Sequence, residues 1–154
     1  MIAIIQRVSK AKVSINQKVI GQIEKGYLVL LGVVKGDTDQ DLDYLVKKIS
    51  SLRIMADQDK KMNLNLKDVN GEVLVISQFT LAGNVKKGNR PSFINAANPE
   101  VGEKYYLQFI KTLRDQGLKV ETGQFGGYME VSLVNDGPTT IIIDSKANHT
   151  PGVW

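Results

Sequence analysis

The opening stretch of the chain, MIAIIQRVSKAKVSINQKVIGQIEKGYLVLLGVV at residues 1–34, decides the fold class. From Lys10 to Ile15 apolar and polar residues alternate, which is typical of a half-buried β-strand. We predict strands at residues 2–8, 10–15, 19–24 and 27–34, separated by short turns. Because such short loops join antiparallel neighbours, we expect an antiparallel meander here.

The period then changes to that of an α-helix. Apolar residues fall on one helical face at Leu42, Leu45, Val46, Ile49 and Leu52. The acids just before them suit the N-terminus of a helix, so we interpret them as capping residues and reject a calcium loop. Asn98 and Pro99 are an N-cap and first-turn pair, and they predict a second amphipathic helix that ends at Gly117.

The remainder of the chain predicts more strands and one long loop. Strands are expected at residues 72–77, 118–122, 129–134 and 139–143, with turns at 57–60 and 135–140. Residues 81–97 have no sustained period, and long loops in compact domains are often functional. The tail at 147–154 is expected to be irregular. We find no repeat and no linker, so residues 1–154 are predicted to form one α+β domain.

Composition restricts the chemistry. The 154 residues include no cysteine and a single histidine, His149. Disulfides, thiolate zinc sites, cysteine nucleophiles and multi-histidine metal centres are therefore excluded. We expect no metal and no other cofactor. Any hydrolysis must proceed without the usual imidazole unless His149 supplies it.

The apolar runs and the charge distribution indicate the compartment and the partners only broadly. The longest apolar run is far shorter than the ~20 residues of a membrane span, and the start lacks the basic segment of an export signal, so we expect a cytoplasmic protein. The formal net charge is +4. The stretch between Val73 and Pro99 contains no acid but carries Lys86, Lys87 and Arg90. Such a patch can meet phosphates or can simply keep the surface soluble.

The pentapeptide SQFTL at residues 77–81 is a candidate site, because a predicted buried strand runs out there into the basic loop. Side-chain hydroxyl and amide groups, with main-chain N–H groups released from a sheet, can hold a developing oxyanion. Local turn hydrogen bonds explain the same residues equally simply. The chain has neither a G-x-S-x-G elbow nor a G-x-x-x-x-G-K-[ST] phosphate loop.

Taken together, these segments resemble the D-aminoacyl-tRNA deacylase family, also called the D-tyrosyl-tRNA deacylase family. The most specific motifs are SQFTL at 77–81, KGNRPSF at 87–93 and NDGP at 135–138, and KMN at 61–63 and TGQFG at 122–126 support them. The resemblance extends from Gln6-Arg7-Val8 to Gly137-Pro138. It implies a single domain with a mostly antiparallel, barrel-like sheet and two main amphipathic helices.

The resemblance also implies a function. Members hydrolyse the ester between a D-amino acid and the 3′-terminal adenosine of tRNA, also remove glycine, and spare L-aminoacyl-tRNA. They are homodimers with active sites at the interface. Carried over to this chain, the catalytic residues are Ser77, Gln78, Phe79 and Thr80. In the same way, Gly137 and Pro138 of the second subunit would reject an L side chain, with Arg7 supporting them.

Further roles are implied for the RNA end of the substrate. Phe125 and Met129 are expected near the terminal adenosine, and Lys86, Lys87 and Arg90 are expected at the acceptor-stem phosphates. The chain departs from the family's usual sequence at two positions. Thr139 replaces a valine, with little consequence expected, and Gly127 replaces an alanine, which we expect to loosen the adenosine pocket.

The sequence is compatible with two mechanisms and with three classes of function. We favour hydrolysis assisted by the ribose 2′-hydroxyl, with the Phe79 and Thr80 N–H groups as oxyanion donors. The alternative makes Thr80 Oγ a nucleophile, which lacks an evident base. Besides the deacylase, a non-catalytic tRNA- or RNA-binding homodimer stays open. A hydrolase of small esters or peptides is disfavoured by the missing elbow.

Overall fold

The computed structural model describes residues 1–147 of the chain. The predicted irregular tail, apart from its first residue, and His149 lie outside the described residues. The described part forms the elements β1 (Ile2–Ile15), β2 (Lys18–Ile23), β3 (Gly26–Gly32), α1 (Asp39–Ser51), β4 (Met55–Ala56), β5 (Met62–Leu64), η1 (Lys67–Val69), β6 (Glu72–Ser77), η2 (Phe79–Ala82), α2 (Pro99–Asp115), β7 (Lys119–Thr122) and β8 (Glu130–Asp144). The α+β class with two main helices is confirmed.

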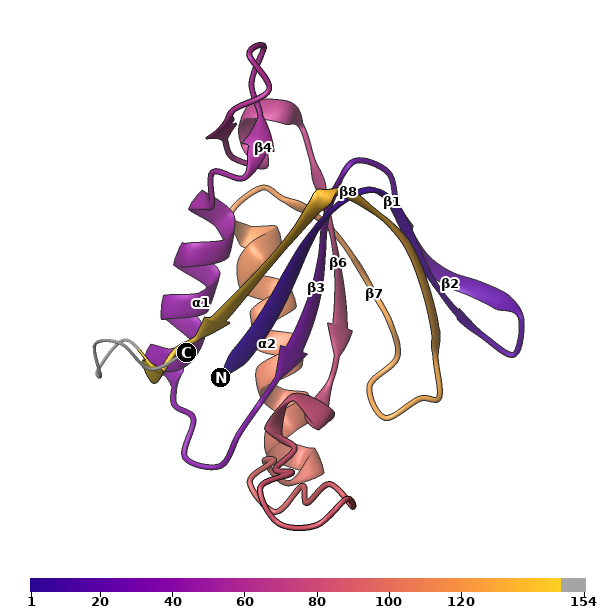
Figure 1. The fold of residues 1–154 in the computed structure, drawn as a ribbon, viewed down its shortest axis with the longest axis vertical. Helices are drawn as coiled ribbons and strands as arrows, with labels where there is room; N and C mark the ends of the chain where they lie inside the picture. The colour runs from indigo at the N-terminus through magenta and orange to yellow at the C-terminus, as the bar shows by residue number, and fades with distance from the viewer. Residues whose placement is uncertain (148–154) are drawn as a thin grey trace.

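The first strand is longer than predicted, and this changes the topology. Residues 2–8 and 10–15 belong to a single strand, β1, which pairs antiparallel with β3 along its first half and with β2 along its second half. The predicted meander is therefore wrong: β3 pairs with β1, not with β2. Strand β1 is long enough to pair with both β2 and β3. After the short turn that follows β2, β3 therefore lies beside the first half of β1 (Figure 1).

The last strand is also continuous. We expected two strands with a turn at residues 135–140, whereas β8 runs from Glu130 to Asp144 and pairs with β1 along nearly its whole length. The register jumps from Gln6 opposite Thr140 to Val8 opposite Asn135. Four residues of β8, at positions 136–139, thus lie opposite the single residue Arg7. The predicted turn is a large bulge inside a strand.

The sheet is mixed and strongly curled. β6 pairs parallel with β3, and β7 pairs parallel with β6, while all pairings of β1 are antiparallel. At the far end the curl brings β2 close to β7. A Cβ on Gly21 would lie 2.5 Å from the main-chain oxygen of Thr122, so only glycine permits this approach. The sheet is consequently nearly closed, as a barrel-like fold requires.

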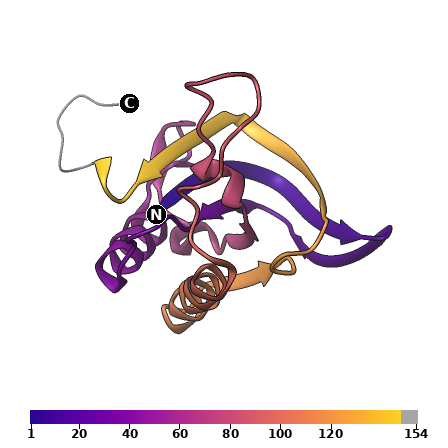
Figure 2. The same cartoon turned by 90° about the horizontal axis from the view of Figure 1, so that it is seen from below.

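Both helices lie on one side of the sheet, and the opposite face of β1, β3 and β8 is left open (Figures 1 and 2). The main core fills the space between helices and sheet, with Phe109 and Tyr27 among its largest fully buried side chains. A smaller apolar cluster, which includes Val13, Leu74 and Ile76, lies inside the curl. The sheet therefore has two regions outside the main core: the curl around this smaller cluster, and the open face of β1, β3 and β8.

The predicted starts of both helices are confirmed by their capping contacts, and α2 ends at Asp115, two residues before the predicted Gly117. The main-chain N–H of Thr38 donates to Oδ2 of Asp41 at 2.8 Å at the start of α1. Asn98 Oδ1 accepts from the N–H of Val101 at 2.9 Å, and Pro99 occupies the first turn of α2. Among residues 1–147, neither helix has the length and apolarity that a membrane span needs.

Candidate active site

A cleft with a volume of about 490 Å³ opens where β6 ends. Its lining comes from the end of β6 and η2, from the start of α2, and from the segment that leads into β8. Three residues of the SQFTL motif, Ser77, Gln78 and Phe79, thereby meet Phe125 and Met129. Two motifs that lie about 50 residues apart in the sequence thus share one cavity, as expected for the parts of a single site.

The SQFTL motif leaves the sheet abruptly. The N–H of Gln78 still donates to the main-chain oxygen of Leu31 at 2.8 Å, and the chain then turns into the 3₁₀ helix η2. The first N–H groups of any helix have no partner inside it, and Phe79 and Thr80 supply these groups here. The Phe79 side chain is 57% exposed and packs edge-on against Phe93, with ring centroids 5.1 Å apart.

Thr80 and Gln78 contact each other directly. Gln78 Nε2 donates a hydrogen bond to Thr80 Oγ1. An amide nitrogen cannot accept a proton, so this contact orients the threonine hydroxyl without activating it. Of the four predicted catalytic residues, Thr80 is the one that does not line the cleft.

The aromatic wall of the cleft is held from beneath. Phe125 packs against Tyr106 with centroids 5.8 Å apart. The Tyr106 hydroxyl donates to the main-chain oxygen of Val75 at 2.9 Å, two residues before Ser77. Burial raises the pKa of Tyr106 to about 12, so the phenol keeps its proton and remains a donor. Tyr106 therefore fixes both the ring of Phe125 and the strand that ends in the SQFTL motif.

Two glycines border the cleft, and one of them, Gly123, leaves room for the Met129 side chain. A Cβ on Gly123 would lie 2.5 Å from Sδ of Met129 and 3.1 Å from Cδ1 of Ile76. The second glycine, Gly127, does not have the effect on the pocket that we expected. A Cβ on Gly127 would lie 3.2 Å from Cδ1 of Ile15 and 3.3 Å from the main-chain oxygen of Gln124. No open space stands where the alanine methyl would be, so Gly127 does not loosen the pocket.

The described lining of the cleft carries almost no ionisable group. Tyr128 is the exception, and the lining residues of the described chain include no carboxylate, imidazole, ammonium or guanidinium group. A cleft with this lining can position a substrate and stabilise an oxyanion through main-chain N–H groups, but its side chains offer no strong general base.

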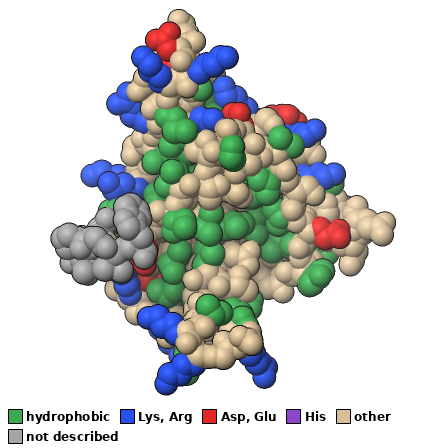
Figure 3. Space-filling model, viewed as in Figure 1, with side chains coloured by type: hydrophobic (Ala, Val, Ile, Leu, Met, Phe, Trp, Pro, Cys, Tyr) green, Lys and Arg blue, Asp and Glu red, His purple; other side chains and the backbone are tan. Residues whose placement is uncertain are grey.

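The three predicted phosphate contacts lie on the loop that follows η2. Lys86, Lys87 and Arg90 are all exposed, and main-chain hydrogen bonds between Asn84 and Ser92 close the base of the loop. Figure 2 shows the loop rising on the side of the sheet opposite to the helices. In Figure 3 basic side chains gather at this end of the molecule. None of the three lines the cleft itself.

The NDGP motif is anchored elsewhere. Gly137 and Pro138 are exposed, their peptide bond is cis, and Gly137 has a φ of +141°. Arg7 holds the preceding residue: its Nε donates to the main-chain oxygen of Asp136 at 2.9 Å. Asn135 Oδ1 accepts from the N–H of Thr139 at 2.7 Å across the bulge. Arg7 thus contacts the residue just before the dipeptide that it is predicted to support.

The two signatures do not meet within one chain. Ser77 is level with Leu31, Leu31 with Ala3, and Ala3 with Ile143, five residues beyond Pro138. Strand spacing and rise then separate Ser77 from Pro138 by about 20 Å. Any contact between the SQFTL and NDGP motifs requires a second copy of the chain.

Comparison with known proteins identifies the family of this chain. The sequence model of the family described as D-Tyr-tRNA(Tyr) deacylase matches residues 4–144. The chain belongs to this family. Two curated relatives named D-aminoacyl-tRNA deacylase are those of Thermotoga petrophila, 55% identical over 95% of this chain and 98% of the relative, and of Persephonella marina, 56% identical over 96% and 99%. The family is one of enzymes.

Solved structures confirm the deacylase fold. A structure titled c-Myc DNA Unwinding Element Binding Protein superposes with a TM-score of 0.88 at 39% identity, covering 94% of this chain and 98% of the other. A probable eukaryotic D-amino acid tRNA deacylase superposes with a TM-score of 0.78 at 18% identity, covering 92% and 97%, and supports the fold alone.

The sequence did not indicate that Val33, Ala96, Ala97 and Pro99 line one wall of the cleft. Val33 follows β3, and the N–H of Ala97 donates to its main-chain oxygen at 3.1 Å. The Asn98-Pro99 cap was a usable signal for this position. The pairing of residues 33–35 with residues 95–97 carries no local pattern, because it joins two loops 60 residues apart.

Proposed function

We propose that the chain hydrolyses the ester of D-aminoacyl-tRNA and of glycyl-tRNA, and that it spares L-aminoacyl-tRNA. The observation that carries the proposal is the uncharged cleft beside the SQFTL motif. An aminoacyl ester is already activated, so a site that offers position and oxyanion donors suffices for its hydrolysis. Peptides and simple esters need a stronger nucleophile than this lining supplies.

The terminal adenosine fits the apolar part of the cleft. Phe125 and Met129 present a flat ring and a polarisable thioether, which suit a purine. The 2′-hydroxyl beside the ester is then the group that assists attack by water, and the Phe79 and Thr80 N–H groups receive the oxyanion. We expect a terminal 2′-deoxyadenosine to slow turnover strongly. An unchanged rate would remove the substrate-assisted mechanism.

The proposal requires a homodimer. On the open face of the sheet, Ile142, Ile4 and Leu30 are register partners that form an apolar row across β8, β1 and β3. The row continues to Ile76, which lines the cleft, and Ile142 is 65% exposed. Figure 3 shows apolar side chains across this face. An exposed apolar patch of this kind favours a second copy as its cover.

In such a dimer the exposed Gly137-Pro138 of one subunit approaches the cleft of the other. A glycine and a proline held by Arg7 present main chain rather than a flexible side chain to the substrate α-carbon. An L side chain is then excluded by shape, whatever its chemistry, while a D side chain or a hydrogen is accepted. The site needs no reader for any particular amino acid.

Lys86, Lys87 and Arg90 are proposed to contact acceptor-stem phosphates. Contacts of this kind add affinity that falls with salt and do not read sequence. Replacing all three by alanine should weaken tRNA binding and reduce the slope of log K against log salt by roughly 2 to 3. An unchanged slope would contradict the assignment.

Aminoacyl-tRNA, the proposed substrate, is made in the cytoplasm, so we propose that the protein acts there.

The deciding experiment follows ester loss from matched D-tyrosyl-, L-tyrosyl- and glycyl-tRNA. We expect rapid loss of the first and third and persistence of the second. Equal loss of both mirror-image substrates would contradict the proposed selectivity. Tight tRNA binding without hydrolysis would instead establish the alternative, a non-catalytic RNA-binding homodimer.

A second experiment tests the shared site. Arg7→Ala damages the motif that excludes an L side chain and should relax selectivity, whereas Phe79→Pro removes a main-chain N–H from the oxyanion site and should abolish hydrolysis. A heterodimer of the two variants keeps one undamaged pair of motifs, so refolding them together should raise the ratio of D- to L-tyrosyl-tRNA hydrolysis above that of Arg7→Ala alone. An unchanged ratio, although light scattering finds dimers, would contradict a site shared between subunits.

A further inference from the structure

Tyr128 lies at the edge of the cleft with its side chain in solvent. The residue is 92% exposed, although it is one of those that line the cleft. It belongs to the connection between β7 and β8, which turns at the lower edge of the curl in Figure 1. A ring that stays in water contributes little apolar burial to folding, so its place beside a cavity points to a contact with a ligand.

Two of the three aromatic rings of the cleft already have partners. Phe79 packs edge-on against Phe93, and Phe125 packs against Tyr106. Tyr128 is the third aromatic residue of the lining, and no other ring in the described part of the chain packs against it. Its ring is therefore the one that is available for stacking at the rim of the cleft.

The main chain on both sides of Tyr128 is held in place. The N–H of Gly127 donates to the main-chain oxygen of Gln124 at 3.2 Å, and Gly126 has a φ of +71°, which favours glycine. On the other side, Met129 contributes its side chain to the lining of the cleft. Little further ordering of the main chain is needed when this ring meets a ligand, which lowers the cost of binding.

The size of the cleft decides which part of the substrate reaches Tyr128. A volume of about 490 Å³ holds one drug-sized group. Under the proposed function, on which this inference rests, the terminal adenosine and its amino acid fill that space, with the adenosine at Phe125 and Met129. The nucleotide before it, a cytidine in tRNA, must then lie outside the cleft at its rim. Tyr128 directly precedes Met129, so its ring stands beside the terminal adenosine on the solvent side.

Both kinds of group that hold a single strand of RNA are present around the cleft. The three cations of the basic loop, Lys86, Lys87 and Arg90, are exposed and follow η2. Tyr128 is exposed on the connection that leads to β8. Single-strand-binding proteins combine cations that meet the backbone with aromatic rings on which bases stack. The cations are proposed above to meet phosphates, so the base that lies beside the cleft is left to Tyr128.

We propose that the ring of Tyr128 stacks on the base of the penultimate nucleotide, a cytidine, at the 3′ end of tRNA. This is a second nucleotide subsite, outside the cleft and next to the one proposed for the terminal adenosine. Because it contacts a base and not the ester, it acts on the affinity for RNA and not on the chemical step. A second copy of the chain is the competing occupant for an exposed aromatic ring, and the experiments below distinguish the two.

The test is a double-mutant cycle between protein and RNA. The probe is an acceptor-stem RNA hairpin whose terminal 3′-amino-adenosine carries D-tyrosine through an amide, which resists hydrolysis, and a second probe lacks only the penultimate base. Loss of this base should weaken binding to the wild type about tenfold and binding to Tyr128→Leu less than twofold. Tyr128→Phe is the matched control, because it keeps the ring and should behave as the wild type. An equal loss for the wild type and Tyr128→Leu would overturn the proposal, and so would undetectable binding of the intact probe to the wild type.

Two further measurements examine the stacking and the competing occupant. With the fluorescent analogue pyrrolocytidine at the penultimate position, binding to the wild type or to Tyr128→Phe should quench the emission, and binding to Tyr128→Leu should not. Equal quenching by all three proteins would place the base elsewhere and overturn the proposal. In sedimentation velocity we expect Tyr128→Leu to match the wild type at every protein concentration. A variant that dissociates at concentrations where the wild type stays associated would assign Tyr128 to a contact between subunits instead.

Failure of the proposed function has a different signature. For D-tyrosyl-tRNA we expect Tyr128→Leu to raise KM about tenfold while kcat changes less than twofold, and for D-tyrosyl-adenosine, which lacks the penultimate nucleotide, we expect equal rates. An unchanged KM for D-tyrosyl-tRNA would overturn the stacking and leave the proposed function standing. If neither protein hydrolyses either substrate while the binding cycle still shows the coupling, the proposed function fails and the nucleotide subsite stands.

Discussion

Arg7 on β1 holds the main chain of Asp136 on β8: its Nε donates to the Asp136 main-chain oxygen at 2.9 Å. The same guanidinium donates through Nη1 to the main-chain oxygen of Ile54 at 2.6 Å, and Nε also lies 3.3 Å from Oδ2 of Asp136. The Arg7 residue is only 8% exposed. One buried side chain thus joins the bulge of β8 to the segment after α1, and it fixes the base of the exposed Gly137-Pro138.

We predict that Arg7→Lys loosens this base. A lysine has no planar fork, so it cannot reach Asp136 and Ile54 together, and one buried acceptor loses its partner. We expect the free energy of unfolding to fall by about 2 kcal/mol in urea titrations. The ratio of D- to L-tyrosyl-tRNA hydrolysis should fall as well. Lys12→Ala, an exposed change on the same strand, is the control, and equal ratios in the two variants would contradict the role of Arg7.

At Thr139 we predict a substitution that raises stability. Its Oγ1 is buried and has no hydrogen-bond partner among the described residues. Thr139→Val replaces this hydroxyl by a methyl of similar size, so we expect the melting temperature to rise by about 2–4 °C. Thr140→Val is the matched control, because Thr140 Oγ1 accepts from Asn135 and Gln6, and that variant should melt lower. A fall in both variants would refute the argument.

Local signals in the sequence predicted the helices and β6 closely. The Asn98-Pro99 pair gave the start of α2, and the strand predicted at residues 72–77 is β6 as observed. These elements are set by capping, by turn residues and by periodicity, which lie within a few residues of one another. The sequence also singled out the SQFTL motif, and the family resemblance pointed to Phe125; Ser77, Gln78, Phe79 and Phe125 line the same cleft.

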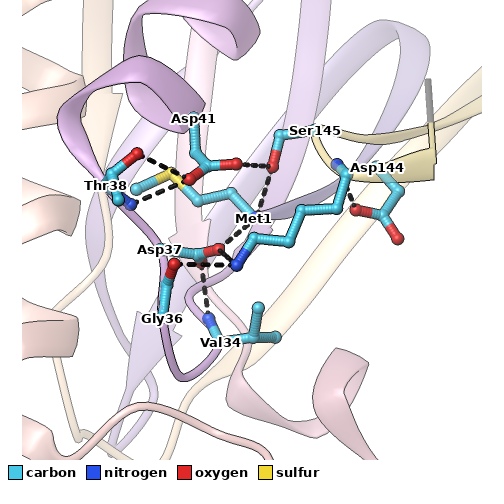
Figure 4. A network of polar contacts seen from close by, with 9 residues as sticks. Met1, Val34, Gly36, Asp37, Thr38, Asp41, Asp144 and Ser145 are labelled. Carbon is cyan, nitrogen blue, oxygen red and sulfur yellow. Dashed lines mark hydrogen bonds and ion pairs between the residues drawn. The ribbon is translucent and has the colours of Figure 1, made fainter. Parts of the chain in front are cut away.

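Other features depend on residues far apart, so no local pattern predicts them. The bulge of β8 at residues 135–140 resembles a turn until Arg7 is placed opposite it. The same holds for β3, whose neighbour is decided by the length of β1 rather than by the turn before it. The hydrogen bond from Ser145 to Asp41 joins the segment after β8 to α1 (Figure 4), and nothing near either residue indicates it. Within the site, the wall formed by Val33 and Ala97 was missed for this reason.

The ion pair between Glu72 and Lys119 predicts a pH dependence of stability. The hydrogen bond from Lys119 lowers the pKa of Glu72 below 4.5 although burial opposes it, and the same pair raises the pKa of Lys119 above 10.5. Because the Glu72 pKa is depressed by folding, its stabilisation is complete above the ordinary pKa and is lost as pH falls through the folded value. The Lys119 contribution is present below its ordinary pKa and is lost as pH rises through the folded value.

We therefore expect urea midpoints to fall both below about pH 4 and above about pH 10.5, and Glu72→Gln to flatten both limbs. High salt should weaken the effect, since the Lys119 side chain is largely exposed. Glu130→Gln, an exposed change on β8, is the control. Identical pH profiles for wild type and Glu72→Gln would contradict the assignment.

Thr80 separates the two mechanisms. Its hydroxyl accepts a hydrogen bond from Gln78 Nε2, and the described lining of the cleft holds no strong base that could take its proton. A main-chain N–H of residue 80 survives substitution by alanine, so Thr80→Ala should keep the deacylation rate within about tenfold, whereas removing a nucleophile typically costs far more. The rate is read from D-tyrosyl-tRNA under single-turnover conditions, with circular dichroism as the check on folding. A folded Thr80→Ala variant without activity, and without an acyl-enzyme that the wild type forms, would make Thr80 the nucleophile and would exclude hydrolysis driven by the 2′-hydroxyl.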